Sequence, residues 1–178
     1  MFDGVGRRRN ETQGTLFFLG SNSLNGNERD CLFRNNGDGT FTDVAYVVNA
    51  DRVEDGRGVA IFDYDQDGRA DVALRNYKQP AQLLHNVGTT GHWLELKLIG
   101  TRSNRDAVGA HITLRAGGRL QMREVHAGSA YQSGSSLIQH FGLGDAARAD
   151  EISIRWPSGT ASTLTRVDAD QLLVVREP

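Results

Sequence analysis

The feature that most constrains the fold is a nine-residue acidic loop between two short apolar runs. It reads Asp63-Tyr64-Asp65-Gln66-Asp67-Gly68-Arg69-Ala70-Asp71 and is flanked by Val59–Phe62 and Val72–Leu74. Carboxylates at loop positions 1, 3, 5 and 9 repel one another at short range, and a hard cation that prefers oxygen ligands removes that repulsion. The spacing therefore predicts a Ca²⁺ site. Its ligands would be the backbone carbonyl of Arg69 and the carboxylates of Asp63, Asp65, Asp67 and Asp71.

The residues around this loop favour strands over the paired helices of an EF-hand. An EF-hand loop ends in a bidentate glutamate at position 12, where this sequence has Leu74. The rest of the chain is a succession of short apolar runs separated by Gly, Asn and Asp turns. We therefore expect an all-β fold.

Strict alternation of apolar and polar residues marks the second half of the chain. This pattern places one side-chain set on a buried sheet face, because successive strand residues point to opposite faces. A Gly117-Gly118 pair between two such runs predicts a two-residue hairpin. The expected core consists of Leu94, Leu96, Leu98, Ile112, Leu114, Ile152, Ile154 and Trp156.

The first half contains a degenerate internal repeat. Leu32–Gly37, read as LFRNNG, returns 51 positions later as LLHNVG at Leu83–Gly88. An apolar run that ends in Asn precedes each copy, at Leu16–Asn22 and at Val72–Asn76. This spacing is close to the period of β-propeller blades.

Two family resemblances rest on these residues. Asp55–Phe62 with the acidic loop resembles the FG-GAP/VCBS repeat of integrin-α-type β-propellers, and Leu32–Asp43 resembles the start of such a repeat. From about Gly91 the chain resembles the ASPIC/UnbV domain of the cartilage acidic protein family. The matching segments are Gly100–Ala110, Arg123–Ser129, His140–Gly144 and Arg155–Gly159.

The resemblance implies a partial β-propeller-like repeat region with a calcium loop at residues 1–88, followed by a C-terminal β-sandwich-like domain at residues 89–178. Family members are usually found outside the cytoplasm. Their calcium loops hold the fold, and their modules are associated with adhesion and protein interaction, with no established catalytic site. Family members usually carry several repeats, whereas this sequence carries at most two.

Composition excludes several functional classes. Lys and Arg number 20 against 22 Asp and Glu, so the net charge of −2 gives no reason to expect nucleic-acid binding. The apolar run Leu16–Leu19 is too short to span a membrane. Cys31 stands alone, so no internal disulfide forms. Polar residues follow Arg7–Arg9, so we expect no signal peptide within this sequence.

The sequence thus favours a non-enzymatic, calcium-stabilised extracytoplasmic protein, periplasmic or secreted. We expect the protein to be an accessory subunit of a larger hetero-complex. A membrane complex that it contacts peripherally is one such assembly. Two repeats cannot close a propeller, so we expect an edge or sheet face within residues 14–60 to be buried by another chain.

Two other functions stay open at this stage. A carbohydrate-binding or adhesion module would stack a glycan on Tyr131, joined by Trp156, although Trp156 also fits the core pattern. A hydrolase would use residues of the polar segment near His126 and His140, but a Gly-x-Ser-x-Gly nucleophile motif is missing there. The candidate residues are Ser129, Ser133, Ser135, Ser136 and Asp145.

Overall fold

The computed structural model describes residues 28–89, 91–128, 130–131 and 133–178, and its regular elements in these ranges are all strands. The all-β prediction is confirmed. The described chain forms two compact units, one from residues 28–56 and 76–80 and the other from residues 57–75 and 81–178. The domain boundary expected after residue 88 stays a prediction. No helix long and apolar enough to cross a membrane occurs among the described residues.

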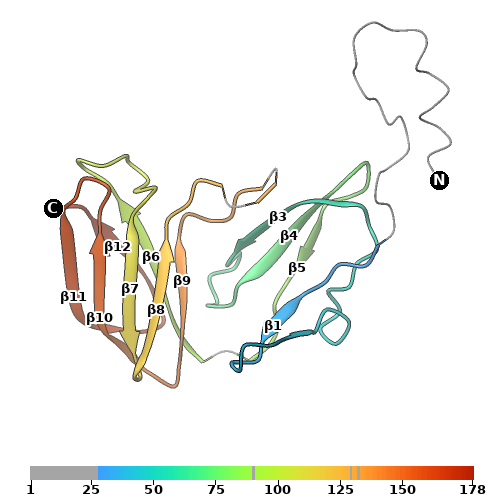
Figure 1. The fold of residues 1–178 in the computed structure, drawn as a ribbon, viewed down its shortest axis with the longest axis horizontal. Helices are drawn as coiled ribbons and strands as arrows, with labels where there is room; N and C mark the ends of the chain where they lie inside the picture. The colour runs from blue at the N-terminus through green and yellow to red at the C-terminus, as the bar shows by residue number, and fades with distance from the viewer. Residues whose placement is uncertain (1–27, 90, 129, 132) are drawn as a thin grey trace, which may run out of the picture. The chain divides into compact units, whose positions relative to one another are not determined.

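The first unit contains the hairpin of β1 (Phe33–Asn35) and β2 (Phe41–Asp43), drawn in blue in Figure 1. The Gly37 N–H donates to the Asn35 side-chain oxygen over 2.8 Å and starts the turn. The same local bond recurs 51 residues later, where the Gly88 N–H donates to the Asn86 side-chain oxygen over 3.1 Å. The two copies of the repeat therefore share this hydrogen bond as well as a sequence pattern, although Gly37 has a positive φ and Gly88 does not.

The second unit begins with a three-stranded sheet in the order β3-β4-β5. Its strands are β3 (Gly56–Phe62), β4 (Asp71–Asn76) and β5 (Gln82–Leu84), and the last two are antiparallel. The acidic loop is the connection from β3 to β4, as its flanking apolar runs predict.

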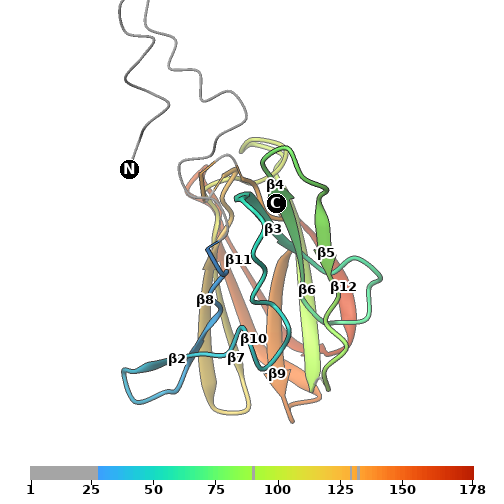
Figure 2. The same cartoon turned by 90° about the vertical axis from the view of Figure 1, so that its right-hand side faces the viewer.

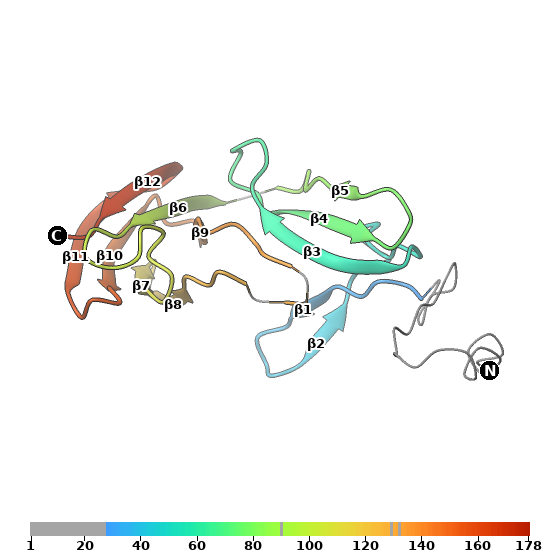
Figure 3. The same ribbon diagram turned by 90° about the horizontal axis from the view of Figure 1, so that it is seen from above.

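Seven further strands form two sheets that pack face to face, seen as two layers in Figures 2 and 3. One sheet has the order β11-β10-β7-β8 and the other the order β12-β6-β9, with β12 parallel to β6. The strands are β6 (His92–Ile99), β7 (His111–Ala116), β8 (Arg119–Glu124), β9 (Gln139–Gly144), β10 (Arg148–Arg155), β11 (Ala161–Asp168) and β12 (Gln171–Arg176). The β-sandwich-like prediction is confirmed, and none of the described sheets closes on itself.

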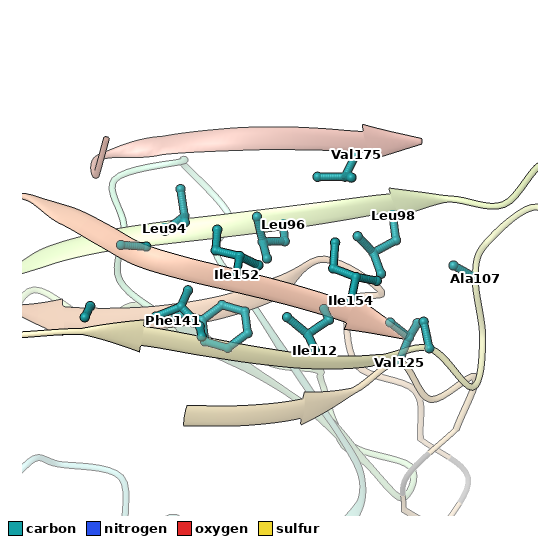
Figure 4. Packing of buried hydrophobic residues seen from close by; sticks show 14 of the residues in the cluster. Leu94, Leu96, Leu98, Ala107, Ile112, Val125, Phe141, Ile152, Ile154 and Val175 are labelled. Carbon is teal, nitrogen blue, oxygen red and sulfur yellow. The ribbon is translucent and has the colours of Figure 1, made fainter. Parts of the chain in front are cut away.

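The core lies between these two sheets (Figure 4). All eight residues expected from alternation are buried, at 0–5% exposure, and Phe141 from β9 joins them. The β7–β8 hairpin also forms at Gly117-Gly118, both with positive φ, as a two-residue turn of the primed kind requires. Leu120 and Met122 on β8 are exposed, because they lie opposite Arg115 and Thr113 on the outer face of the sheet.

Candidate metal centre

Asp71 is the most deeply placed carboxylate of the acidic loop, with 1% of its surface exposed. It begins β4, and the hydrogen-bonding strand fixes its backbone. Its two oxygens each accept a backbone N–H, one from Tyr64 at 3.0 Å and one from Asn86 at 2.8 Å. Asp71 therefore joins the start of the loop to the turn of the repeated segment.

Asp63 closes the loop from the other end, immediately after β3. Its Oδ1 accepts the Asp67 N–H at 3.2 Å, and its Oδ2 accepts the Gly68 N–H at 2.7 Å. Gly68 has φ of +83°, which lets the chain turn back towards Asp63. These bonds wind the loop around its own carboxylates.

The winding brings Asp63, Asp65 and Asp71 together, with one oxygen of each within 4.8 Å of the others. Calcium–oxygen bonds of 2.3–2.6 Å place two ligands of one ion at most about 5.2 Å apart. The three oxygens satisfy that limit, and each is the hard, anionic donor that Ca²⁺ prefers. The donor set therefore fits a calcium ion, and these three residues would hold it.

Asp67 is placed differently from the prediction. Its Oδ1 accepts the Arg69 N–H at 2.9 Å, and its other oxygen pairs with the Arg69 guanidinium. It groups with Asp65 and His85 within 4.8 Å instead of with Asp63 and Asp71. The predicted four carboxylates thus form two overlapping groups that share Asp65, because Arg69 neutralises Asp67 locally. The Arg69 carbonyl stays a predicted ligand.

His85 is a neighbour of the loop that sequence reasoning missed. Its Nε2 lies 3.3 Å from Asp65 Oδ2, and the ring of Tyr64 meets its ring edge-on with centroids 5.2 Å apart. The signal for His85 was its place in the repeated LLHNVG segment, one residue before the Asn86 that bonds to Asp71. Imidazole suits transition metals better than calcium, so the oxygen-only group is the better calcium candidate.

The loop packs on the outer face of the β12-β6-β9 sheet. His140 Nε2 donates to the Gly68 carbonyl at 2.9 Å, and its ring stacks on Trp93 with centroids 6.4 Å apart and an interplanar angle of 8°. A methyl group added at Gly68 would overlap the Trp93 indole. Gly68 is therefore required twice, for its positive φ and for the close approach of Trp93.

Glu95, which lies between Trp93 and Lys97 on this outer face, is 6% exposed. Burial raises the pKa of its carboxyl, the charge of Asp63 raises it further, and His140 partly offsets both. Glu95 and His140 are cross-strand partners in the β6–β9 ladder. A carboxylate of the sandwich thus lies in the electrostatic field of the acidic loop.

The candidate serines serve a structural purpose on β3. Ser133 Oγ accepts the Val59 N–H at 2.8 Å, Ser135 Oγ accepts the Ile61 N–H at 3.2 Å, and the Ser136 N–H donates to the Ile61 carbonyl at 3.1 Å. These three serines cover the edge of β3, and none of them bonds to a histidine among the residues that the structure describes. Ser129 lies outside the described residues.

The remaining parts of the alternative sites do not come together among the described residues. His126 Nδ1 lies 3.7 Å from Glu124, which also has His111 at 3.8 Å, so the two histidines flank a carboxylate. Trp156 is 2% exposed and donates from Nε1 to Ser162 at 2.8 Å. The idea that Trp156 joins Tyr131 in a glycan-stacking surface is therefore wrong, because the sandwich core needs its indole.

Glu177 organises the loop that carries the first segment of the ASPIC/UnbV resemblance. Its Oε2 accepts the N–H groups of Thr101, Arg102 and Ser103 at 2.7–2.8 Å, and its Oε1 accepts hydroxyls that include those of Ser103 and Ser158. Burial opposes ionisation, but these hydrogen bonds together hold the pKa of Glu177 far below its ordinary value. One carboxylate, just after β12, thereby holds the 101–103 loop and Ser158 together.

Comparison with known families agrees with this architecture. The profile described as FG-GAP-like repeat matches residues 15–74, and the profile described as ASPIC and UnbV matches residues 100–178. The chain is thus similar to an FG-GAP-like repeat in one part and to an ASPIC/UnbV domain in another, and the resemblance inferred from the sequence is confirmed. The FG-GAP-like match includes the acidic loop, and the ASPIC/UnbV match includes β7 to β12.

Similar proteins include cartilage acidic protein 1 from three vertebrates. A 68-residue segment is 41% identical to the Xenopus tropicalis protein, 40% to the Homo sapiens protein and 37% to the Mus musculus protein. In each case the match covers 38% of this chain and 10% of the relative. The match therefore spans about a tenth of the length of these relatives.

Proposed function

We propose that this chain is a non-enzymatic protein-interaction module that works outside the cytoplasm, secreted or periplasmic, and uses Ca²⁺ to hold its fold. The FG-GAP-like repeat, the ASPIC/UnbV domain and the similarity to cartilage acidic protein 1 support an extracellular interaction role. Within this proposal the chain is an accessory subunit of a larger protein complex.

Calcium is supported by the oxygen group of Asp63, Asp65 and Asp71. Free calcium outside the cytoplasm is around millimolar, which matches the weak calcium sites of extracellular modules. The ion would neutralise carboxylates that the loop forces together, so its binding energy would add to the stability of the folded chain.

The observation that carries the interaction role is the exposure of large apolar side chains on the β1–β2 hairpin and the turn that follows it. Phe33 and Phe41 are both 62% exposed, and Tyr46 and Val47 are more than 80% exposed. Apolar side chains that gather on a surface in this way are typical of contacts with other proteins.

The fold reduces the part of residues 14–60 that is left for contact with another chain. The Ser133–Ser136 segment of this same chain already covers β3 at Val59 and Ile61. Residues 14–27 of the expected region lie outside the described residues. We therefore propose that the β1–β2 hairpin is the part of this region that contacts another subunit. We also propose that this subunit is a different protein, so that the assembly is a hetero-complex and not a homo-oligomer.

Site-directed photocrosslinking in the native host tests this proposal. A photoreactive residue replaces Tyr46 in one variant and the exposed Leu120 of β8 in the matched control. With calcium present, the Tyr46 probe is expected to capture a discrete protein band outside the cytoplasm, and the Leu120 probe is not. Equal labelling from both positions, or capture of this chain alone, would contradict a specific hetero-complex.

A glycan-binding role keeps one supporting observation, the 75% exposure of Tyr131. A single exposed tyrosine offers little area for stacking a sugar ring. The second aromatic residue of the predicted pair, Trp156, is buried and does not add to it. Binding to a glycan array that is lost in Tyr131→Ala would favour this second candidate over protein contact.

A further inference from the structure

The acidic loop supplies fewer ligands than calcium normally takes. Calcium binds six to eight oxygens, and an EF-hand loop completes that number with a glutamate at position 12. Here Leu74 stands at position 12, and Asp67 is paired with Arg69. An ion held by Asp63, Asp65 and Asp71 thus has coordination positions left for further oxygen ligands, water among them.

Glu95 on β6 is a further carboxylate on the sheet face that the acidic loop covers. Alternation on β6 turns Leu94 and Leu96 into the sandwich core and Glu95 to the outer face, where a glutamate is ordinarily solvated. It is nevertheless 94% buried, since the acidic loop lies on this face through the contacts of Gly68 with Trp93 and His140. A carboxylate with so little exposure is stabilised by a partner that neutralises it.

No hydrogen bond to the Glu95 side chain occurs within the described part of the chain, although it interacts electrostatically with Asp63 and His140. His140 is itself bonded to the Gly68 carbonyl. Glu95 stands outside the 4.8 Å oxygen group, so its oxygens lie too far for direct ligation alongside all three aspartates. A water bound to the ion could bridge that separation and donate to Glu95.

We infer that Glu95 is a further member of the calcium site, contributed by the β-sandwich, and that it accepts a hydrogen bond from a water bound to the loop's ion. This inference rests on the proposed calcium site. Its consequence is that the ion joins the β3–β4 loop, which lies in the FG-GAP-like match, to β6 of the sandwich.

The test uses the full chain as wild type and as Glu95→Gln, Glu95→Asp and Glu151→Gln. Glu151 is an exposed glutamate of β10 in the opposite sheet, so its variant controls for the change in net charge. Calcium binding is measured by titration calorimetry, and melting is measured in CaCl₂ and in EGTA. Loss of a residue in this outer position typically weakens metal affinity roughly ten-fold or more.

Glu95→Gln is therefore expected to raise the calcium Kd about ten-fold and to melt at or above the wild-type temperature in EGTA, because an uncompensated buried charge is gone. Glu95→Asp keeps the charge and is expected to retain most of the affinity, and Glu151→Gln should match wild type. The inference is overturned if Glu95→Gln binds calcium with wild-type affinity, or if Gln and Asp variants lose affinity equally. A wild-type chain that binds no calcium refutes the proposed site itself.

Discussion

The substitution Asp65→Asn separates calcium ligation from the hydrogen bonds that build the acidic loop. Asp65 belongs to the oxygen group but accepts no backbone N–H among the described residues, and its contact is with His85 at 3.3 Å. Asp71, in contrast, accepts two backbone N–H groups while almost fully buried. Replacing Asp65 therefore removes a ligand and leaves the loop's own bonds in place.

The expected size follows from linkage. A ligand that binds the folded state stabilises it by RT ln(1 + [L]/Kd), so a Kd of about 10 μM at about 1 mM calcium contributes about 2.7 kcal/mol. For a chain of this size, each kcal/mol shifts Tm by about 2–4 °C, which gives a calcium-induced rise of about 5–10 °C. Asp65→Asn should lose most of that rise and melt within about 1 °C of wild type in EGTA.

Asp71→Asn, unlike Asp65→Asn, is expected to remove a hydrogen bond that builds the loop. An amide offers one acceptor oxygen where the carboxylate offers two, so either the Tyr64 or the Asn86 N–H faces an NH₂ group. Loss of a hydrogen bond to a charged group costs about 1.5–3 kcal/mol, which should lower Tm in EGTA as well as in calcium. Asp150→Asn, an exposed aspartate on β10, is the matched control and should leave both melting temperatures unchanged.

Scanning calorimetry in 1 mM CaCl₂ and in EGTA measures all four proteins, and titration calorimetry gives their calcium affinities. The reasoning fails if wild type melts at the same temperature in both buffers. It also fails if Asp65→Asn takes up calcium with wild-type affinity, since the loop would then bind the ion without the residue that its two acidic groups share.

Three further outcomes are expected from the same structure. Glu177→Gln should destabilise the chain at neutral pH and weaken the dependence of its Tm on acid pH. The lowered pKa of Glu177 stabilises the folded chain at pH values above the ordinary pKa of 4.5, and this stabilisation is lost as the pH falls below 4.5. A series of Tm measurements against pH checks this. Ile154→Asp should abolish cooperative unfolding, because it places a charge in the core, and a soluble variant with unchanged calorimetry contradicts the core assignment. Gly68→Ala should lower Tm and calcium affinity far more than Gly118→Ala, which has similar φ but open space around it; equal effects would show that the Trp93 contact adds nothing.

Local patterns made most of the sandwich predictable. Alternation identified all eight core residues, since a one-residue slip would have exposed the whole set. The strands that escaped are β9 and β11. On β9 the only large apolar residues are Phe141 and Leu143, and on β11 they are Leu164 and Val167, so neither strand shows a run of alternating large apolar residues. The parallel pairing of β12 with β6 is non-local and leaves no trace in either segment.

The candidate site was predictable to the extent that it is local. Spacing alone indicated that carboxylates of the loop would lie close together, as Asp63, Asp65 and Asp71 do, but it could not show that Asp67 would pair with Arg69. Their role as calcium ligands stays a prediction. His85 comes from the next turn of the repeat. Glu95 on β6 and His140 on β9 come from the sandwich, and nothing in a sequence pattern says which strand face a distant loop will cover. Tertiary packing alone supplies that information.

The two attachments of the β3–β4 segment determine where a calcium ion would act. One end of the segment is held by Ser133–Ser136 on the β3 edge, and the loop at the other end is held by Gly68 against Trp93 and His140. The serines immediately precede β9, and His140 is the residue before the core side chain Phe141. Loosening the loop would thus disturb β9 from its outer face. Calcium stabilisation should accordingly extend to the sandwich, and hydrogen exchange of β6 and β9 should slow when calcium is added, together with that of the loop. Slowing confined to residues 63–71 would show that the contacts at Gly68 transmit no stability.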